Sequence, residues 1–174
     1  MGKVERDFYL ADAVTVARQL PGMELVMAAG EKCRRHLITE TEAYLGDSDR
    51  ACHASRGRTR RTEPMYLEGG HLYIYFVYGM HWMLNVVTGP AEHPQAVLIR
   101  GVSQYPGPGR VTKGLGIDGS FNREDLASSG RIWIENTGFR PELVAGPRVG
   151  IEYAGEPWIS KPWRFMIRNE KERI

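Results

Sequence analysis

The stretch that decides the fold is LYIYFVYGMHWMLNVVT, residues 72–88, followed after a short break by QAVLIRGV, residues 95–102. Both segments are rich in β-branched and aromatic side chains, which favour strands. Residues 78–81 contain a glycine and divide the first segment into two strands, 72–77 and 82–88. The pattern predicts three sequential antiparallel strands at the centre of a sheet, with residues 78–81 as the turn of a hairpin.

The rest of the chain adds short elements on both sides of these strands. A helix is predicted over 12–20, because Ala13, Ala17 and Leu20 share one face and Pro21-Gly22 follow. Further strands are predicted over 23–28, 34–43, 131–135, 148–153 and 163–168, and short helices over 111–117 and 121–126. Strands mixed with short helices, without βαβ alternation, indicate an α+β fold with a mainly antiparallel sheet.

Length and composition exclude several classes of protein. The chain has 174 residues, about the length of one domain. It carries 23 basic and 21 acidic residues, which excludes a polycationic DNA-coating protein and an acidic tail. Two cysteines cannot form a disulfide framework, so a reducing compartment is expected. Neither a signal peptide nor an apolar run of about 20 residues is present, and no membrane association is predicted.

Two acids and an aromatic side chain share one predicted strand face. Period-two alternation places Glu40, Glu42 and Tyr44 on the same side of strand 34–43 and its extension. Such a face is often only solvated, but Cys52-His53 and a group of arginines follow closely. A carboxylate near an imidazole and aromatic rings can act as a general base. The pattern itself leaves open which of the two glutamates would do so.

Residues 46–64 form a basic loop that nearly lacks apolar side chains. Five arginines lie within twelve positions: Arg50, Arg56, Arg58, Arg60 and Arg61. A run of charges is usually a solvated surface, yet this run lies beside a hairpin tip, Tyr78-Gly79-Met80, that carries large side chains. Exposed apolar tips insert into membranes, protein partners or stacked bases. Arginines next to aromatic side chains and such a tip favour phosphate binding.

No pattern in the sequence predicts a metal or a cofactor. The five histidines and two cysteines form no close pair of ligands such as Cys-x-x-Cys. Phosphate-binding loops, dinucleotide fingerprints and the Gly-x-Ser-x-Gly elbow are also missing.

Taken in order, these segments resemble the alkyladenine (3-methyladenine) DNA glycosylase family, the type without a helix-hairpin-helix. The resemblance spans residues 7–168 and rests on blocks in the family's order: ETEAYLG (40–46), DRACH (49–53), GRTRR (57–61), YIYFVYGMH (73–81), LNVV (84–87), LIR (98–100), RVGI (148–151) and KPWRF (161–165). It implies a single compact α+β domain over residues 1–174, with a curved, mainly antiparallel sheet, short peripheral helices and a protruding β-hairpin. Thr62, where asparagine is common, and the bulky Trp82-Met83 depart from the family pattern.

The resemblance also implies a role for individual residues. Glu42 would activate the attacking water, and Arg100 would help to hold that water and the nearby phosphate region. The residues that would bind the flipped base are Tyr44, His53, Tyr75 and Asn85, with Asn85 excluding guanine-type bases. Side chains that would enter the duplex are Tyr78 and Met80. Those that would contact DNA phosphates are Arg56, Arg58, Arg60 and Arg61.

The implied activity is hydrolysis of the N-glycosidic bond of a damaged purine in duplex DNA, leaving an abasic site. Expected substrates are 3-methyladenine and, as further candidates, hypoxanthine, ethenoadenine and 7-methylguanine. None of the five lysines falls in the acid–aromatic cluster, so no strand-nicking lyase activity is expected. We expect a monomer. We also expect it in the cytoplasm, associated with the nucleoid if the source is bacterial.

Two other functions remain open at this level. A non-catalytic nucleic-acid-binding module would use the arginines and tyrosines and leave Glu42 structural. A hydrolase of nucleosides or small N-glycosides would use Glu42 but need neither an exposed Tyr78 nor clustered arginines.

Overall fold

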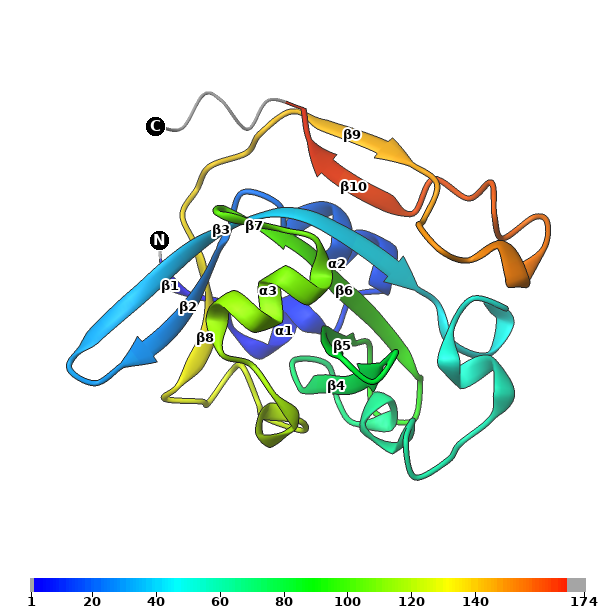
Figure 1. Ribbon diagram of the computed structural model, residues 1–174, viewed down its shortest axis with the longest axis horizontal. Helices are drawn as coiled ribbons and strands as arrows, with labels where there is room; N and C mark the ends of the chain where they lie inside the picture. The colour runs from blue at the N-terminus through cyan, green and yellow to red at the C-terminus, as the bar shows by residue number, and fades with distance from the viewer. Residues whose placement is uncertain (1, 169–174) are drawn as a thin grey trace.

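The computed structural model describes residues 2–168. Strand β3 (Lys32–Tyr44) lies in the middle of its sheet (Figure 1). Its first half pairs with β2 (Glu24–Ala29), and its second half pairs with β6 (Gln95–Val102) on one side and β10 (Arg164–Ile167) on the other. A strand of 13 residues can hold different neighbours along its two halves. The second half, where Glu40, Glu42 and Tyr44 lie, is therefore flanked on both sides.

All strand pairs are antiparallel, as the sequence predicts. The order in the sheet is β1-β8-β2-β3-β6-β5-β4, with β10 and β9 attached beside β3 and β7 beside β6. The elements not yet placed are β1 (Gly2–Lys3), β4 (Leu72–Val77), β5 (His81–Thr88), β7 (Tyr105–Pro106), β8 (Ile132–Asn136) and β9 (Leu143–Gly146). The chain forms one compact α+β domain, which confirms the predicted fold class.

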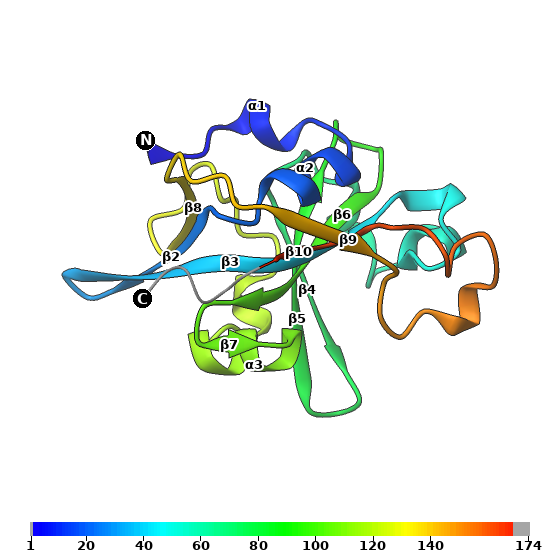
Figure 2. The same ribbon diagram turned by 90° about the horizontal axis from the view of Figure 1, so that it is seen from above.

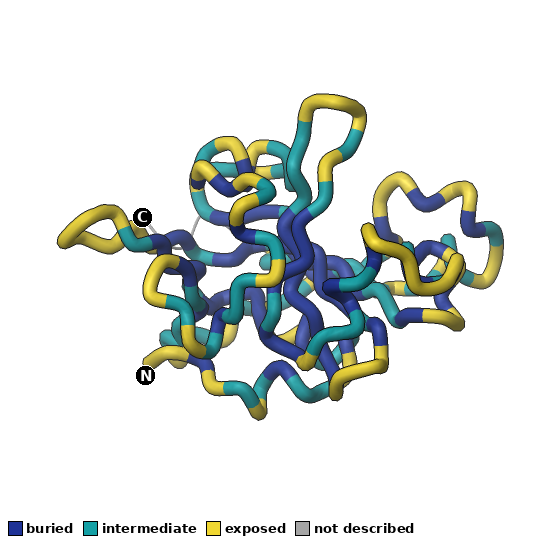
Figure 3. Tube along the Cα trace, turned by 90° about the horizontal axis from the view of Figure 1, so that it is seen from below, coloured by how far each residue is buried: buried dark blue, intermediate teal, exposed yellow. Residues whose placement is uncertain are grey.

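The predicted strands 72–77, 82–88 and 95–102 are present, but the prediction that all three lie at the centre of the sheet is wrong. β3 is central and β4 is an edge strand. β5 pairs with β6 only over 85–88, whereas it pairs with β4 over 81–86. The outer part of the β4–β5 hairpin is therefore free to project from the body of the protein, as Figures 2 and 3 show.

Short helices cover both faces of the sheet (Figure 2). Helices α1 (Arg6–Tyr9) and α2 (Ala13–Gln19) lie on one face and α3 (Pro108–Leu115) lies on the other. The Asp12 carboxylate caps α2 by accepting hydrogen bonds from two backbone N–H groups. α3 begins three residues before the predicted start, because proline is favoured in the first turn of a helix. Among residues 2–168, no helix combines the length and apolar character needed to cross a membrane.

Two predicted elements are absent. Residues 121–126 form no helix: the backbone of Arg123 and Glu124 hydrogen-bonds to Leu72 instead. This segment thus covers the edge of β4, which would otherwise be exposed to pairing with another chain. Residues 148–153 form no strand either, and the strand that pairs with β10 is the earlier β9. Arg148 instead turns inward to a buried carboxylate, and a short 3-10 turn (Glu152–Ala154) follows.

Candidate active site

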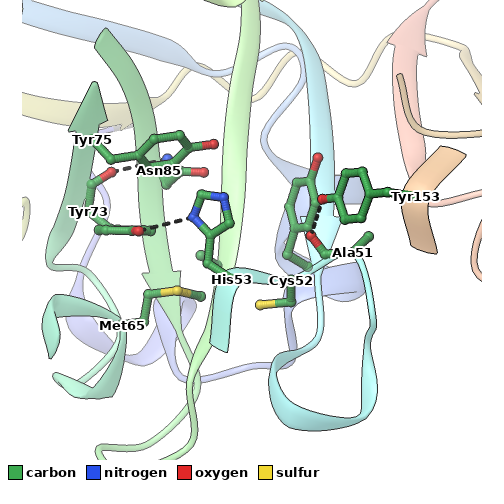
Figure 4. A pocket seen from close by; sticks show the side chains of 10 residues that line it. Ala51, Cys52, His53, Met65, Tyr73, Tyr75, Asn85 and Tyr153 are labelled. Carbon is green, nitrogen blue, oxygen red and sulfur yellow. Dashed lines mark hydrogen bonds between the residues drawn. The ribbon is translucent and has the colours of Figure 1, made fainter. Parts of the chain in front are cut away.

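A pocket opens where β3 ends, between the basic loop 46–64 and the β4–β5 hairpin (Figure 4). It encloses about 350 Å³, including its mouth. Its lining is dominated by rings and consists of Tyr44, Ala51, Cys52, His53, Met65, Tyr73, Tyr75, Asn85, Ala96 and Tyr153. A pocket walled by rings is suited to a flat aromatic ligand.

Three of the rings pack against one another. The centroid of the His53 ring lies 4.6 Å from that of Tyr75, and those of Tyr73 and Tyr75 are 5.1 Å apart. His53 Nδ1 also lies 3.1 Å from the hydroxyl of Tyr73. Burial and the nearby Arg61 and Arg56 lower the pKa of His53 to about 4. The imidazole is therefore neutral near pH 7 and does not repel a cationic ligand.

Glu42 lies beneath this pocket and is completely buried. Its Oε2 accepts a hydrogen bond from the Tyr44 hydroxyl at 2.8 Å, and its Oε1 accepts one from the Val149 N–H at 2.7 Å. The Nε of Arg100 is 3.5 Å from the same Oε1. Burial raises the pKa of the Glu42 carboxyl, although Arg100, the Val149 N–H and Tyr44 oppose the shift. A buried carboxylate with a raised pKa is a stronger proton acceptor than an ordinary glutamate.

Neither Glu42 nor the other candidate acid, Glu40, is among the residues that line the pocket. Glu40 Oε1 accepts hydrogen bonds from the Nε of Arg100 at 3.0 Å and the Nε of Arg164 at 2.6 Å. Both candidate acids thus contact Arg100, but Glu42 alone is bonded to a side chain of the pocket wall.

A buried ion pair lies next to the pocket wall. Arg148 donates from Nη1 to Asp49 Oδ2 at 2.6 Å and from Nη2 to Asp49 Oδ1 at 2.9 Å, and both side chains are fully buried. The guanidinium also lies 4.8 Å from the ring centroid of Tyr44 and 4.9 Å from that of Trp163. The pair fixes the start of the basic loop and supports Tyr44 from behind.

The predicted phosphate-binding arginines are in different surroundings. Arg56 and Arg61 line a second hollow that shares Ala51, Cys52, His53 and Tyr153 with the pocket, and Arg61 also lies over the ring of Tyr75. Arg60 is exposed. Arg58 is already paired with two carboxylates, those of Glu63 and Glu92. The three other arginines are thus less neutralised by the protein than Arg58.

The tip of the β4–β5 hairpin is exposed, as predicted. Tyr78 has 86% of its surface exposed and Met80 has 66%. Tyr78 also has a backbone φ of +54°, a left-handed conformation that tyrosine rarely adopts. Asn85 lies at the opposite end of the same hairpin, buried in the pocket wall, where its Nδ2 donates to the Tyr73 carbonyl at 3.1 Å.

The sequence did not point to several residues of this site. Tyr153 lines the pocket with its hydroxyl donating to the Ala51 carbonyl at 2.9 Å, and the Val149 N–H holds Glu42. Both lie in the segment that was predicted as a strand. The segment contains Gly150 and is followed by Gly155, and the positive φ of both glycines favours a loop. Within residues 2–168, no group of three His, Cys, Asp or Glu side chains could hold a metal ion.

Comparison with known proteins places this geometry in a family. The family model for methylpurine-DNA glycosylase matches residues 7–106 and 103–171. A protein of Borrelia garinii subsp. bavariensis named "Putative 3-methyladenine DNA glycosylase" is 43% identical, over 97% of each chain. A protein with the same name from the archaeon Methanocella arvoryzae is 38% identical over 97% of this chain and 94% of its own. The chain belongs to the methylpurine-DNA glycosylase family.

Proposed function

We propose that this protein is a DNA glycosylase that removes 3-methyladenine and related damaged purines from duplex DNA by hydrolysis. The observation that carries the proposal is the position of Glu42, buried beneath a pocket of aromatic rings and tied to Tyr44 and to the Val149 N–H. The family supports the reaction class, and the residue roles below form part of the proposal.

Glu42 is the proposed general base. It takes a proton from a water, and the water oxygen forms a bond to C1′ of the deoxyribose while the bond from C1′ to the purine nitrogen breaks. The electron pair of that bond leaves with the base. The transition state resembles an oxocarbenium ion, which a nearby carboxylate stabilises. Arg100, whose Nε lies 3.5 Å from Glu42 Oε1, would help to hold the water. A cationic base such as 3-methyladenine needs no proton to leave.

The aromatic walls favour electron-poor bases. Tyr44 would stack on one face of the flipped base, with His53 and Tyr75 on the other. Each good contact between a cationic base and an aromatic face contributes about 0.5–2 kcal/mol. Because His53 is neutral near pH 7, it adds no repulsion. Asn85 would clash with the exocyclic amino group of guanine bases and so restrict the substrate range.

The exposed residues complete the proposal at the DNA. Flipping the nucleotide costs a few kcal/mol, because its base is unstacked and unpaired. Tyr78 and Met80 would offset part of this cost by filling the gap. Arg56, Arg60 and Arg61, with Arg58 less available, would contact phosphates. Among residues 2–168 no lysine lines the pocket, so we propose simple hydrolysis without lyase chemistry. One chain carries all these groups, so a monomer acting where DNA is, in the cytoplasm or on a nucleoid, suffices.

Release of free bases from methylated duplex DNA tests the proposal. We expect the protein to release 3-methyladenine, separated and identified by chromatography, faster than the same DNA loses it without protein. A borohydride trapping reaction with abasic DNA should give no covalent complex. Binding without release would instead indicate a nucleic-acid-binding module, and release from free nucleosides alone a nucleoside hydrolase.

Replacing Tyr78 by glycine separates stability from activity. The free energy of unfolding should change by no more than about 1 kcal/mol. Glycine relieves the strain of the left-handed backbone at position 78, but it also makes the unfolded chain more flexible, and the two effects oppose each other. Base release from duplex should fall roughly ten- to hundredfold, since stacking at the gap contributes about 1–3 kcal/mol. Single-turnover release and thermal unfolding measure the two effects. Single-stranded DNA is the control, because no gap forms there; an equal loss on both substrates would contradict the role.

A further inference from the structure

Glu40 joins two arginines that come from different strands. Its Oε1 accepts a hydrogen bond from the Nε of Arg100 on β6 and another from the Nε of Arg164 on β10. The side chains of Glu40, Arg100 and Arg164 are 17%, 15% and 27% exposed. Both hydrogen bonds use the same carboxylate oxygen, so Glu40 ties the two guanidinium groups together. Its contacts indicate that it orients the arginines.

The strand pairing is distorted at this point. Thr39 on β3 has no partner on β6, and one step later Arg100 on β6 has no partner on β3. Such bulges turn side chains away from their regular directions and are common beside active sites. Here they flank Glu40 and coincide with its bond to Arg100. The register irregularity and the ion pairs are therefore two independent observations on the same residues.

Both arginines are held by Nε and keep their outer donors free. Within residues 2–168, no Nη atom of Arg100 or Arg164 has a hydrogen-bond partner. A guanidinium fixed by its Nε presents the remaining N–H groups in a planar fork, which matches the oxygens of a phosphate. Arg164 contacts only Glu40 among the acidic residues that the structure describes, whereas Arg100 contacts both Glu40 and Glu42.

The family resemblance already implies that Arg100 lies near a phosphate. We propose that Arg164 binds the same DNA phosphodiester, next to the nucleotide being excised, and that Glu40 is the positioning residue that orients both arginines. This inference rests on the proposed function, because it requires that a damaged nucleotide of duplex DNA is bound at the pocket. It assigns Arg164, which lies opposite Glu42 in the pairing of β10 with β3, a direct contact to DNA. It also removes Glu40 from competition with Glu42 for the role of base.

The salt dependence of duplex binding tests the phosphate contact. Affinities are measured in a Glu42→Gln background so that the DNA stays intact. Arg164→Ala should lower the slope of log affinity against log salt by about 0.9, the value for one lost phosphate contact. Arg168→Ala is the matched control, because Arg168 lies four residues later and is already paired with Glu142. An unchanged slope for Arg164→Ala would overturn the proposed contact.

Two substitutions of Glu40 test the positioning role. Glu40→Ala should lose up to about a hundredfold in single-turnover rate, as expected when a reacting group is misplaced. Glu40→Gln keeps the Oε1 acceptor and should retain most of the rate. Both variants should keep the acid limb of the pH–rate profile, because Glu42 is intact. A loss in Glu40→Gln as large as that in Glu42→Gln would make Glu40 the base and refute the proposal.

The two proposals can fail separately. If the wild-type protein releases no base, the proposed function fails, while the salt slopes still report whether Arg164 contacts phosphate. If Glu40→Ala does not fold, as judged by circular dichroism, Glu40→Gln and Arg164→Ala decide the outcome.

Discussion

Replacing Glu42 by glutamine is expected to abolish base release while duplex binding is retained. Glutamine has the same size and keeps an oxygen that can accept from the Val149 N–H, but it cannot take a proton from water. Removing a general base typically costs about 10²–10⁴-fold in rate. The measurement is single-turnover release from a duplex with one 3-methyladenine, with affinity measured on the same DNA. Loss of binding in parallel with rate would instead make Glu42 a structural acid.

The pH dependence of the wild type provides an independent check on Glu42. Glu40 and Tyr44 on β3, Arg100 on β6 and the Val149 N–H all face this carboxyl, and burial dominates, so its pKa is raised. Base release needs the ionised form, so the rate should fall as pH drops through a value above the ordinary glutamate range. The folded protein binds this proton more tightly than the unfolded chain. The stability of the protein therefore falls as pH rises from the ordinary glutamate pKa to the raised pKa of the folded state. Glu42→Gln has no proton to lose there and should not show this fall in stability.

Replacing Arg148 by alanine is expected to destabilise the fold by about 3–5 kcal/mol, because it leaves the Asp49 carboxylate buried without its cation. The variant also loses the guanidinium that packs on Tyr44 and Trp163. Urea unfolding measures the change in free energy.

The matched control for Arg148→Ala is again Arg168→Ala, whose ion pair with Glu142 is exposed and should contribute at most about 1 kcal/mol. Adding Asp49→Ala to Arg148→Ala should restore part of the loss, since no unpaired charge then remains. Recovery should be incomplete, because Asp49 also accepts from the Leu45 and Ala51 N–H groups. A loss for Arg148→Ala no larger than for the control would contradict the assigned role.

Sequence patterns located the elements that are defined by local alternation. The boundaries 72–77 and 95–102 agree with β4 and β6, because β-branched and aromatic runs end at turn residues there. The same periodicity put Glu42 and Tyr44 on one face, and the structure joins them by a hydrogen bond. Segment 148–153 was misassigned because its conformation depends on Asp49, 99 residues earlier in the chain. Gly150 favours a loop, but no local pattern shows that Arg148 turns inward to Asp49.

The site could be predicted only in part for the same reason. Spacing within the basic loop could not show that Arg58 is paired with Glu63 and Glu92. The roles of Tyr78 and Asn85 came from family resemblance, and they remain predictions. Tyr153 was missed because an aromatic residue in a glycine-containing segment does not by itself indicate a pocket wall.

Some hydrogen-bond partners of Glu42 and Glu40 are synthesised long after the two glutamates themselves. Glu42 bonds to Val149, 107 positions later, and Glu40 bonds to Arg164, 124 positions later. Contacts of such long sequence separation form slowly, and domains begin to fold as the chain emerges. The surroundings of Glu42 are therefore completed only when residues 148–164 are present, because Val149, Tyr153 and Arg164 all belong to this late part of the chain. A chain that ends before residue 148 would lack one hydrogen-bond donor to Glu42 and also Tyr153 of the pocket wall.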